Sequence, residues 1–202
     1  MPVLSLTDRI NLLESDLKGT PPTFIMAREL PFAIFRYDPH LEEESEWKMR
    51  GEVQKLATRV ENETGRKVRL ISLAALFWQS IRESEGIDAI VALEREHGFD
   101  AAQRQVNQYL SDPDFRPLCP LLLETSDALP KDTAVIFLIH ATAFAPGTYR
   151  ISSLLEQLGG KLRIPAVLFY PGRWNHTLNY MGLRSEDQAL GSYRVKIYGR
   201  DS

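Results

Sequence analysis

The side chains best suited to bind an anion lie just after residue 144. Ala145-Pro146-Gly147-Thr148 is followed closely by Arg150, and Pro146 is a typical first residue of a helix. Free N–H groups at a helix start hold phosphate or carboxylate groups, and Thr148 and Arg150 could add hydrogen bonds and charge. A cation in the first helical turn opposes the helix dipole, so Arg150 needs an acidic partner. The sequence favours a salt bridge to a neighbouring loop over a bound ligand in that role.

A second group of candidates combines arginine, aspartate and aromatic side chains near the ends of apolar runs. Arginine and aromatic residues are enriched at the energetic centres of protein interfaces, and they also clamp single-stranded nucleic acid. A structural interpretation is equally good: Arg36 pairs with Asp38, while Tyr170 and Trp174 cover the edge of the core. The candidates for a partner or ligand surface are Arg36, Asp38, His140, Thr148, Arg150, Tyr170, Gly172, Arg173 and Trp174.

Residues that could support metal or nucleophilic chemistry are scattered along the chain. His140 and His176 both follow predicted strands, but no H-x-x-x-H or H-x-H spacing supports a metal site. Glu46-Trp47-Lys48 has the letters of a metal-dependent nuclease motif, but it lies in a highly charged stretch that is typical of an exposed helix. Cys119, the one cysteine, is best interpreted as a small, partly buried hydrophobic residue.

The common motifs of nucleotide binding and hydrolysis are absent. The chain has no G-x-x-x-x-G-K-[ST], no G-x-G-x-x-G after a strand and no G-x-S-x-G. Gly159-Gly160 follows a predicted helix, where glycine ends the helix and the dipole disfavours phosphate. The sequence therefore predicts no catalytic set, no metal and no cofactor.

Composition fits one domain of ordinary globular character. The 202 residues are 44% hydrophobic and carry a formal net charge of -3, so nothing overall indicates a nucleic-acid partner or an acidic membrane surface. The amino terminus lacks the basic start and apolar centre of a secretory signal. Apolar runs such as residues 134–139 are too short to cross a bilayer, and we expect a soluble, cytoplasmic protein.

Apolar runs bounded by turn residues predict the strands. Those at 133–139 and 164–170 show almost no polar alternation, as expected of strands covered on both faces, and Pro171-Gly172 is expected to end the second. A predicted helix from Pro146 to about Leu158 joins them, so they should run side by side and parallel, with a shared ledge at their carboxyl ends. The other predicted strands are 31–37, 68–73, a weaker one at 179–183 and an alternating edge strand at 193–198.

Helical periodicity predicts the rest of the fold. Residues 4–18 and 41–62 read as helices, residues 23–26 as a short strand or a loop, and residues 74–129 as a run of helices without a confident strand. We therefore expect one α/β domain over residues 1–202. It is Rossmann-like, with a mostly parallel sheet of five to six strands flanked by helices, a helical insertion at 74–129 and an edge strand at the C-terminus.

The same strings resemble a known family as a set. L-P-F-A-I-F-R-Y-D-P, A-P-G-T-Y-R-I-S-S-L-L-E-Q-L, I-P-A-V-L-F-Y-P-G, Y-M-G-L and S-Y-R-V-K-I-Y are similar to BrxB, a small component of bacteriophage-exclusion (BREX) defence systems. The resemblance covers nearly the whole chain. It implies a cytoplasmic protein that works beside a methyltransferase, a large ATPase and PglZ, a phosphatase-like component. It carries no catalytic residue set onto this chain.

Three functions follow as hypotheses. The leading one is a non-catalytic accessory or adaptor subunit of a BREX-type complex that docks other components, PglZ first, and meets DNA only through the complex. The alternative is a nucleotide- or anion-binding α/β domain with regulatory or enzymatic activity that uses the helix start at Pro146. Direct DNA binding ranks last because of the net charge of -3.

Overall fold

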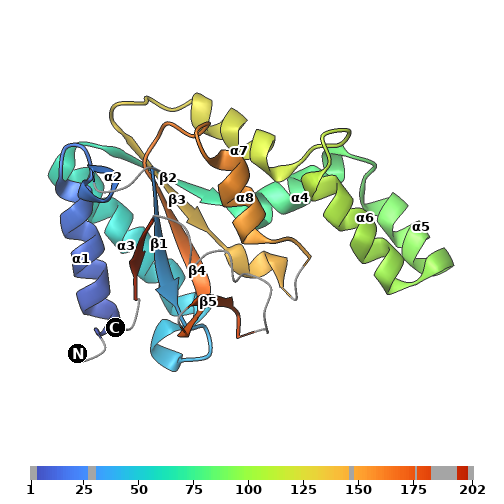
Figure 1. The fold of residues 1–202 in the computed structure, drawn as a ribbon, viewed down its shortest axis with the longest axis horizontal. Helices are drawn as coiled ribbons and strands as arrows, with labels where there is room; N and C mark the ends of the chain where they lie inside the picture. The colour runs from blue at the N-terminus through green and yellow to red at the C-terminus, as the bar shows by residue number, and fades with distance from the viewer. Residues whose placement is uncertain (1–3, 27–30, 146–147, 176, 183–194, 200–202) are drawn as a thin grey trace.

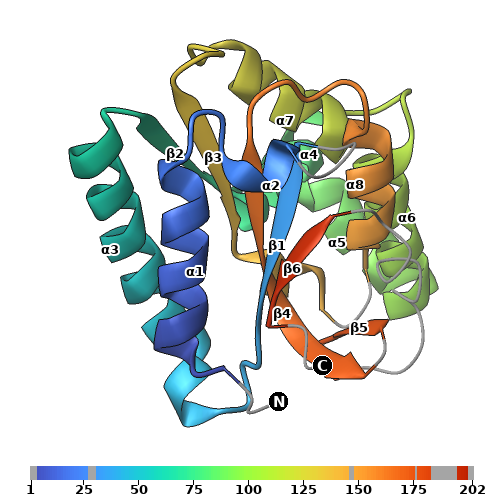
Figure 2. The same cartoon turned by 60° about the vertical axis from the view of Figure 1, so that its left-hand side comes forward.

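The computed structural model describes residues 4–26, 31–145, 148–175, 177–182 and 195–199. Its strands form one six-stranded sheet in the order β2-β3-β4-β1-β6, with β5 paired to β4 outside this path (Figures 1 and 2). Every pair on the path is parallel, and β4 and β5 are antiparallel. The strands are β1 (Phe32–Tyr37), β2 (Lys67–Ser72), β3 (Ala134–Ile139), β4 (Ala166–Asn175), β5 (Thr177–Tyr180) and β6 (Lys196–Tyr198). The predicted α/β fold with a mostly parallel sheet is confirmed.

Helices cover both faces of the sheet, as Figure 2 shows. One face carries α1 (Leu6–Lys18), α2 (Thr23–Met26) and α3 (Glu46–Thr64), the last preceded by the short 3-10 helix η1 (Glu42–Glu44). The other face carries α4 (Leu73–Glu83), α7 (Leu118–Asp127), the 3-10 helix η2 (Ala141–Phe144) and α8 (Ile151–Leu158). Between α4 and α7, α5 (Ile87–His97) and α6 (Phe99–Ser111) extend away from the sheet (Figure 1).

Alternation along the buried strands divides the core into two layers. In β1, Phe32 and Ile34 belong to the layer under α4, α7 and α8, whereas Ala33 and Phe35 belong to the layer under α1 and α3. Successive side chains of a strand point to opposite faces, so an unbroken apolar run fills both layers. This is why the apolar runs at 31–37, 133–139 and 164–170 identified the central strands.

The central prediction about strand direction is confirmed. β3 and β4 are parallel neighbours, with Ile136 opposite Ala166 and Leu138 opposite Leu168. The predicted edge strand at the C-terminus is also present: β6 lies at the edge of the sheet beside β1, and residues 193–194 of the predicted strand lie outside the described residues. The four helices α4 to α7 fill the connection between β2 and β3, and their interpretation as an insertion within a single domain stays a prediction.

Three local predictions are wrong. Residues 23–26 form the helix α2, not a strand or loop. β4 does not end at Pro171-Gly172 but continues to Asn175, because Pro171 still lies opposite Tyr37 and Gly172 then pairs with Tyr180 of β5. The helix expected from Pro146 begins at Ile151, after η2 and a turn; Pro146 and Gly147 lie outside the described residues.

Candidate functional site

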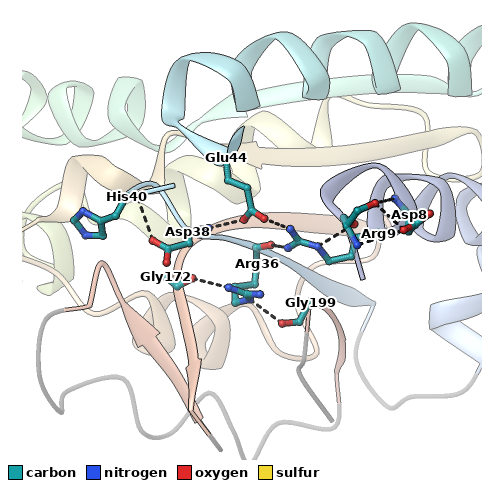
Figure 3. A network of polar contacts seen from close by, with 9 residues as sticks. Asp8, Arg9, Arg36, Asp38, His40, Glu44, Gly172 and Gly199 are labelled. Carbon is teal, nitrogen blue, oxygen red and sulfur yellow. Dashed lines mark hydrogen bonds and ion pairs between the residues drawn. The ribbon is translucent and has the colours of Figure 1, made fainter. Parts of the chain in front are cut away.

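The carboxyl ends of the parallel strands lie at the same end of the sheet, and a network of polar contacts runs across these strand ends (Figure 3). Arg36 on β1 donates from Nε to the Gly199 carbonyl at 2.7 Å and from Nη1 to the Gly172 carbonyl at 3.5 Å. The side chain is buried and joins the chain after β6 to the middle of β4. Arg36 therefore holds three strands together through backbone oxygens.

Close approach explains the glycine at position 199. Its φ of 93° lies in the left-handed region, and a Cβ there would stand 2.8 Å from Arg9 Nη1 and 3.1 Å from Arg36 Nε. Only glycine accepts both the backbone conformation and the two guanidinium groups.

A buried ion pair supports the network from α1. Arg9 of α1 pairs with Glu44 of η1, and Arg9 Nη1 also donates to the Arg36 carbonyl at 2.7 Å (Figure 3). The second Glu44 oxygen accepts from the Asp38 N–H at 2.8 Å. These contacts fix the connection between β1 and α3 against both α1 and the sheet.

Asp38 and Arg173 fasten the β1–α3 connection to the hairpin formed by β4 and β5. Arg173 Nε donates to Asp38 Oδ2 at 2.7 Å, and the side chain of Arg173 is 56% exposed while that of Asp38 is 8% exposed. His40 adds a contact between its Nε2 and the Met181 carbonyl at 3.2 Å. Arg173 thus presents its remaining surface to solvent from a fixed position.

The other predicted residues of β4 lie deeper. Tyr170 is fully buried and packs edge-on against Tyr180, whose hydroxyl donates to the Ala141 carbonyl at 2.8 Å. At Gly172 a Cβ would lie 2.3 Å from the Asn179 carbonyl oxygen, so the hairpin leaves no space for a side chain. Trp174 is half-buried against the layer under α4 and α8.

Thr148 and Arg150 lie apart from this network. Thr148 lines an open hollow of about 240 Å³ together with polar residues of α6, including Asp100 and Arg104. Arg150 is exposed and is the residue that immediately precedes α8. Because the helix begins at Ile151 and not at Pro146, the helix start no longer lies where the predicted anion site needed it.

His140 lies at the carboxyl end of β3 and belongs to a different hollow. Its φ of 60° and ψ of 38° are left-handed, a conformation that costs energy for residues other than glycine and that clusters at functional sites. Its Nδ1 lies 2.9 Å from Oγ of Ser72, which also accepts from the Ala75 N–H at 3.1 Å. Burial lowers the pKa of His140, with the nearby Arg50 adding to the effect, so the ring is neutral at neutral pH.

A pocket of about 250 Å³ opens beside His140, between α3 and the sheet, where it meets the last residues of β1 and β3, Leu70 of β2 and Phe169 within β4. Met49, Val53 and Phe169 give it apolar walls. The polar groups include Gln54, the Tyr37 hydroxyl, which donates to Glu46 Oε2, the Glu46 carboxylate itself, and Arg50, whose Nε lies 3.6 Å from Glu46 Oε1. We name this cavity the α3 pocket.

Sequence reasoning found His140 but missed its neighbours in the α3 pocket. Glu46 and Arg50 are one helical turn apart, and that spacing was the available signal. The charged residues of this stretch predict an exposed helix, which holds for part of α3. Tyr37 lies within an apolar strand, so its sequence context did not mark it as a polar group of a pocket. Burial, and to a smaller extent the Glu46 carboxylate, raises the pKa of the Tyr37 hydroxyl, which therefore stays a hydrogen-bond donor.

Three further observations concern Cys119, possible metal ligands and the length of the helices. Cys119 is buried in α7, and burial raises the pKa of its thiol, which makes it a poor nucleophile. Within the described residues, no three His, Cys, Asp or Glu side chains gather as a metal ion would need. The described helices are all too short or too polar to span a bilayer.

Comparison with known proteins identifies a family. The family described as BREX protein BrxB matches residues 69–196, from the edge strand β2 to β6, which is more than half of the chain. No curated protein and no solved structure matches the chain. The family match agrees with the resemblance found in the strings at 145–158, 164–172 and 192–198. The chain therefore belongs to the BrxB family and is a component of a BREX defence system.

Proposed function

We propose that the chain is an adaptor subunit that docks another component of its BREX system, first the PglZ-like protein. The family supports a role among several proteins. The observation that carries the proposal is a pair of exposed apolar side chains between the end of β1 and the first turn of α3: Leu41 is 50% exposed and Trp47 is 81% exposed. Tryptophan and arginine are among the residue types most enriched at interface centres.

The surface that we propose comprises Leu41, Trp47 and Arg173, and we name it the edge surface. Leu41 donates its N–H to the Asp38 carbonyl at 3.0 Å, and the carboxylate of Asp38 holds Arg173. Trp47 follows within α3 and borders a hollow of about 370 Å³ between α3 and α1. Asp38 holds the backbone of Leu41 and the side chain of Arg173 in place without a partner, so little conformational entropy is lost at these two residues on docking.

The test is co-purification of the PglZ-like component with the intact BREX system. Trp47→Ala should weaken the association about 30-fold, as expected for loss of an interface centre worth about 2 kcal/mol. The substitution should leave stability nearly unchanged because the side chain is mostly in solvent. Arg150→Glu examines the charged residue before α8 in the same assay.

A matched control is Phe99→Ala. Phe99 is 61% exposed and lies at the start of α6, away from the sheet edge (Figure 1). It should leave the association unchanged. If Trp47→Ala and Leu41→Ser both retain every component that the unmodified chain retains, the edge surface is not the docking site.

A further inference from the structure

We propose that the α3 pocket binds a small, uncharged nitrogen heterocycle that carries an amino group, of the nucleobase class. This goes beyond the docking role, because the ligand would bind the isolated chain and would need no partner protein. Four features of the pocket support it: volume, walls, polar groups and the conformation of His140.

Volume limits the size of the ligand. Pockets for drug-sized molecules span about 300–1,000 Å³. The α3 pocket, at about 250 Å³, lies below that range. A single ring system fits such a space, whereas a nucleotide with its sugar and phosphates would extend well beyond it.

The walls favour a flat, apolar body. Met49 of α3 and Phe169 of β4 are each 3% exposed, and Val53 is 4% exposed. A methionine thioether makes favourable contacts with aromatic rings, and the phenyl group of Phe169 offers a second apolar surface. Burying a ring there removes apolar area from water on both sides.

The polar groups of the α3 pocket indicate the charge of the ligand and the hydrogen-bonding groups that the ligand must carry. Glu46 and Arg50 are opposite in charge and His140 is neutral, so the described polar groups sum to no net charge and favour an uncharged ligand. Glu46 Oε1 lies 3.6 Å from Arg50 Nε, beyond hydrogen-bond distance, so it keeps acceptor capacity for an amino group. Arg50 supplies N–H donors for a ring nitrogen next to that amino group.

His140 adds a fixed donor. The Ser72 hydroxyl accepts from the Ala75 N–H and lies 2.9 Å from His140 Nδ1. As part of the proposal, this hydroxyl donates to Nδ1, and the imidazole hydrogen then lies on Nε2, where it is available to a ligand in the pocket. The left-handed backbone at His140 holds the ring at the end of β3 before any ligand arrives.

The experiment is calorimetric titration of the purified full chain with adenine, cytosine and uracil, with the ring signals of His140 followed by NMR. Cytosine and adenine carry an amino group beside a ring nitrogen, and uracil carries carbonyls there instead. We expect adenine and cytosine to bind and to shift the His140 signals, and uracil to bind roughly tenfold more weakly because its carbonyl faces the Glu46 carboxylate.

Two variants locate the binding site. Arg50→Met keeps an apolar stem, removes the donors and should weaken adenine and cytosine binding about tenfold. Lys55→Met changes a residue of the same helix that borders the hollow on the α1 side, and it should bind like the unmodified chain. Absence of binding by all three bases overturns the proposal, as does binding that Arg50→Met leaves unchanged. Equal binding of cytosine and uracil overturns the assignment of the ligand's amino group to Glu46 and of its ring nitrogen to Arg50.

Discussion

The buried pair of Arg9 and Glu44 gives the sharpest test of how the sheet edge is held. The Arg9 side chain is 3% exposed and that of Glu44 is 10% exposed. Arg9 also lies 5.6 Å from the ring centroid of Phe35 and donates to the Arg36 carbonyl. Glu44→Gln keeps the shape and an oxygen for the Asp38 N–H, but it removes the negative charge opposite Arg9.

The expected loss is large for one substitution. Removing one partner of a buried ion pair costs about 3–5 kcal/mol, because the remaining charge loses its compensation while it stays out of water. For a chain of 150–250 residues, each kcal/mol lowers the melting temperature by about 2–4 °C. Glu44→Gln should therefore melt about 6–20 °C below the unmodified chain in a calorimetric scan.

Glu63→Gln is the matched control. Glu63 lies 2.6 Å from the Lys18 ammonium, but the two side chains are 48% and 41% exposed. Pairs of this kind contribute about 0–1 kcal/mol, so the control should melt within about 4 °C of the unmodified chain. The double variant Arg9→Met with Glu44→Gln should recover part of the loss, since it removes both charges. If Glu44→Gln costs no more than Glu63→Gln, the edge does not depend on this pair.

Two further predictions concern β4 and β6. Gly172→Ala should lower the free energy of unfolding by about 1–3 kcal/mol in urea denaturation, because the added methyl group meets the Asn179 carbonyl; an unchanged midpoint would contradict the close approach. Burial alone would raise the pKa of Asp16, but hydrogen bonds from Lys196, Thr23 and Tyr198 outweigh it and the pKa is lowered. Asp16 therefore stabilises the fold above its ordinary pKa of 3.8, and this contribution disappears as the pH falls through the lower folded-state value. Asp16→Asn should unfold more easily than the unmodified chain at pH 7 and should lose most of that difference at pH 2; a difference independent of pH would contradict the assignment.

The sequence predicted the buried strands well because burial on both faces leaves a local signal. Residues 134–139 are apolar throughout, and they form β3. The Pro-Gly pair at 171–172 misled the same reasoning. Pro171 is tolerated within β4 where the strand leaves its parallel partner, and Gly172 is needed where β5 approaches. Local turn propensity could not reveal a hairpin partner eight residues further along the chain.

The candidate site was only partly accessible to sequence reasoning, because its contacts join distant parts of the chain. Arg36 and Gly199 are 163 positions apart, and Asp38 and Arg173 are 135 apart. Arg36 is predicted to pair with Asp38 or to face a partner; its described side-chain bonds go to the carbonyls of Gly172 and Gly199, and a contact with a partner stays a prediction. A guanidinium group has five N–H donors, so it can join several backbone segments at once, and no spacing in the sequence announces that role.

One turn of α3 serves both proposed surfaces. Glu46 and Trp47 are consecutive, and consecutive helical residues point about 100° apart. Glu46 therefore faces the α3 pocket while Trp47 faces the hollow on the α1 side. Glu44 holds the chain just before this turn through the Asp38 N–H and Arg9. Loosening that support should affect ligand binding and docking together, whereas Trp47→Ala should affect docking alone, because its side chain borders the hollow on the α1 side and not the α3 pocket.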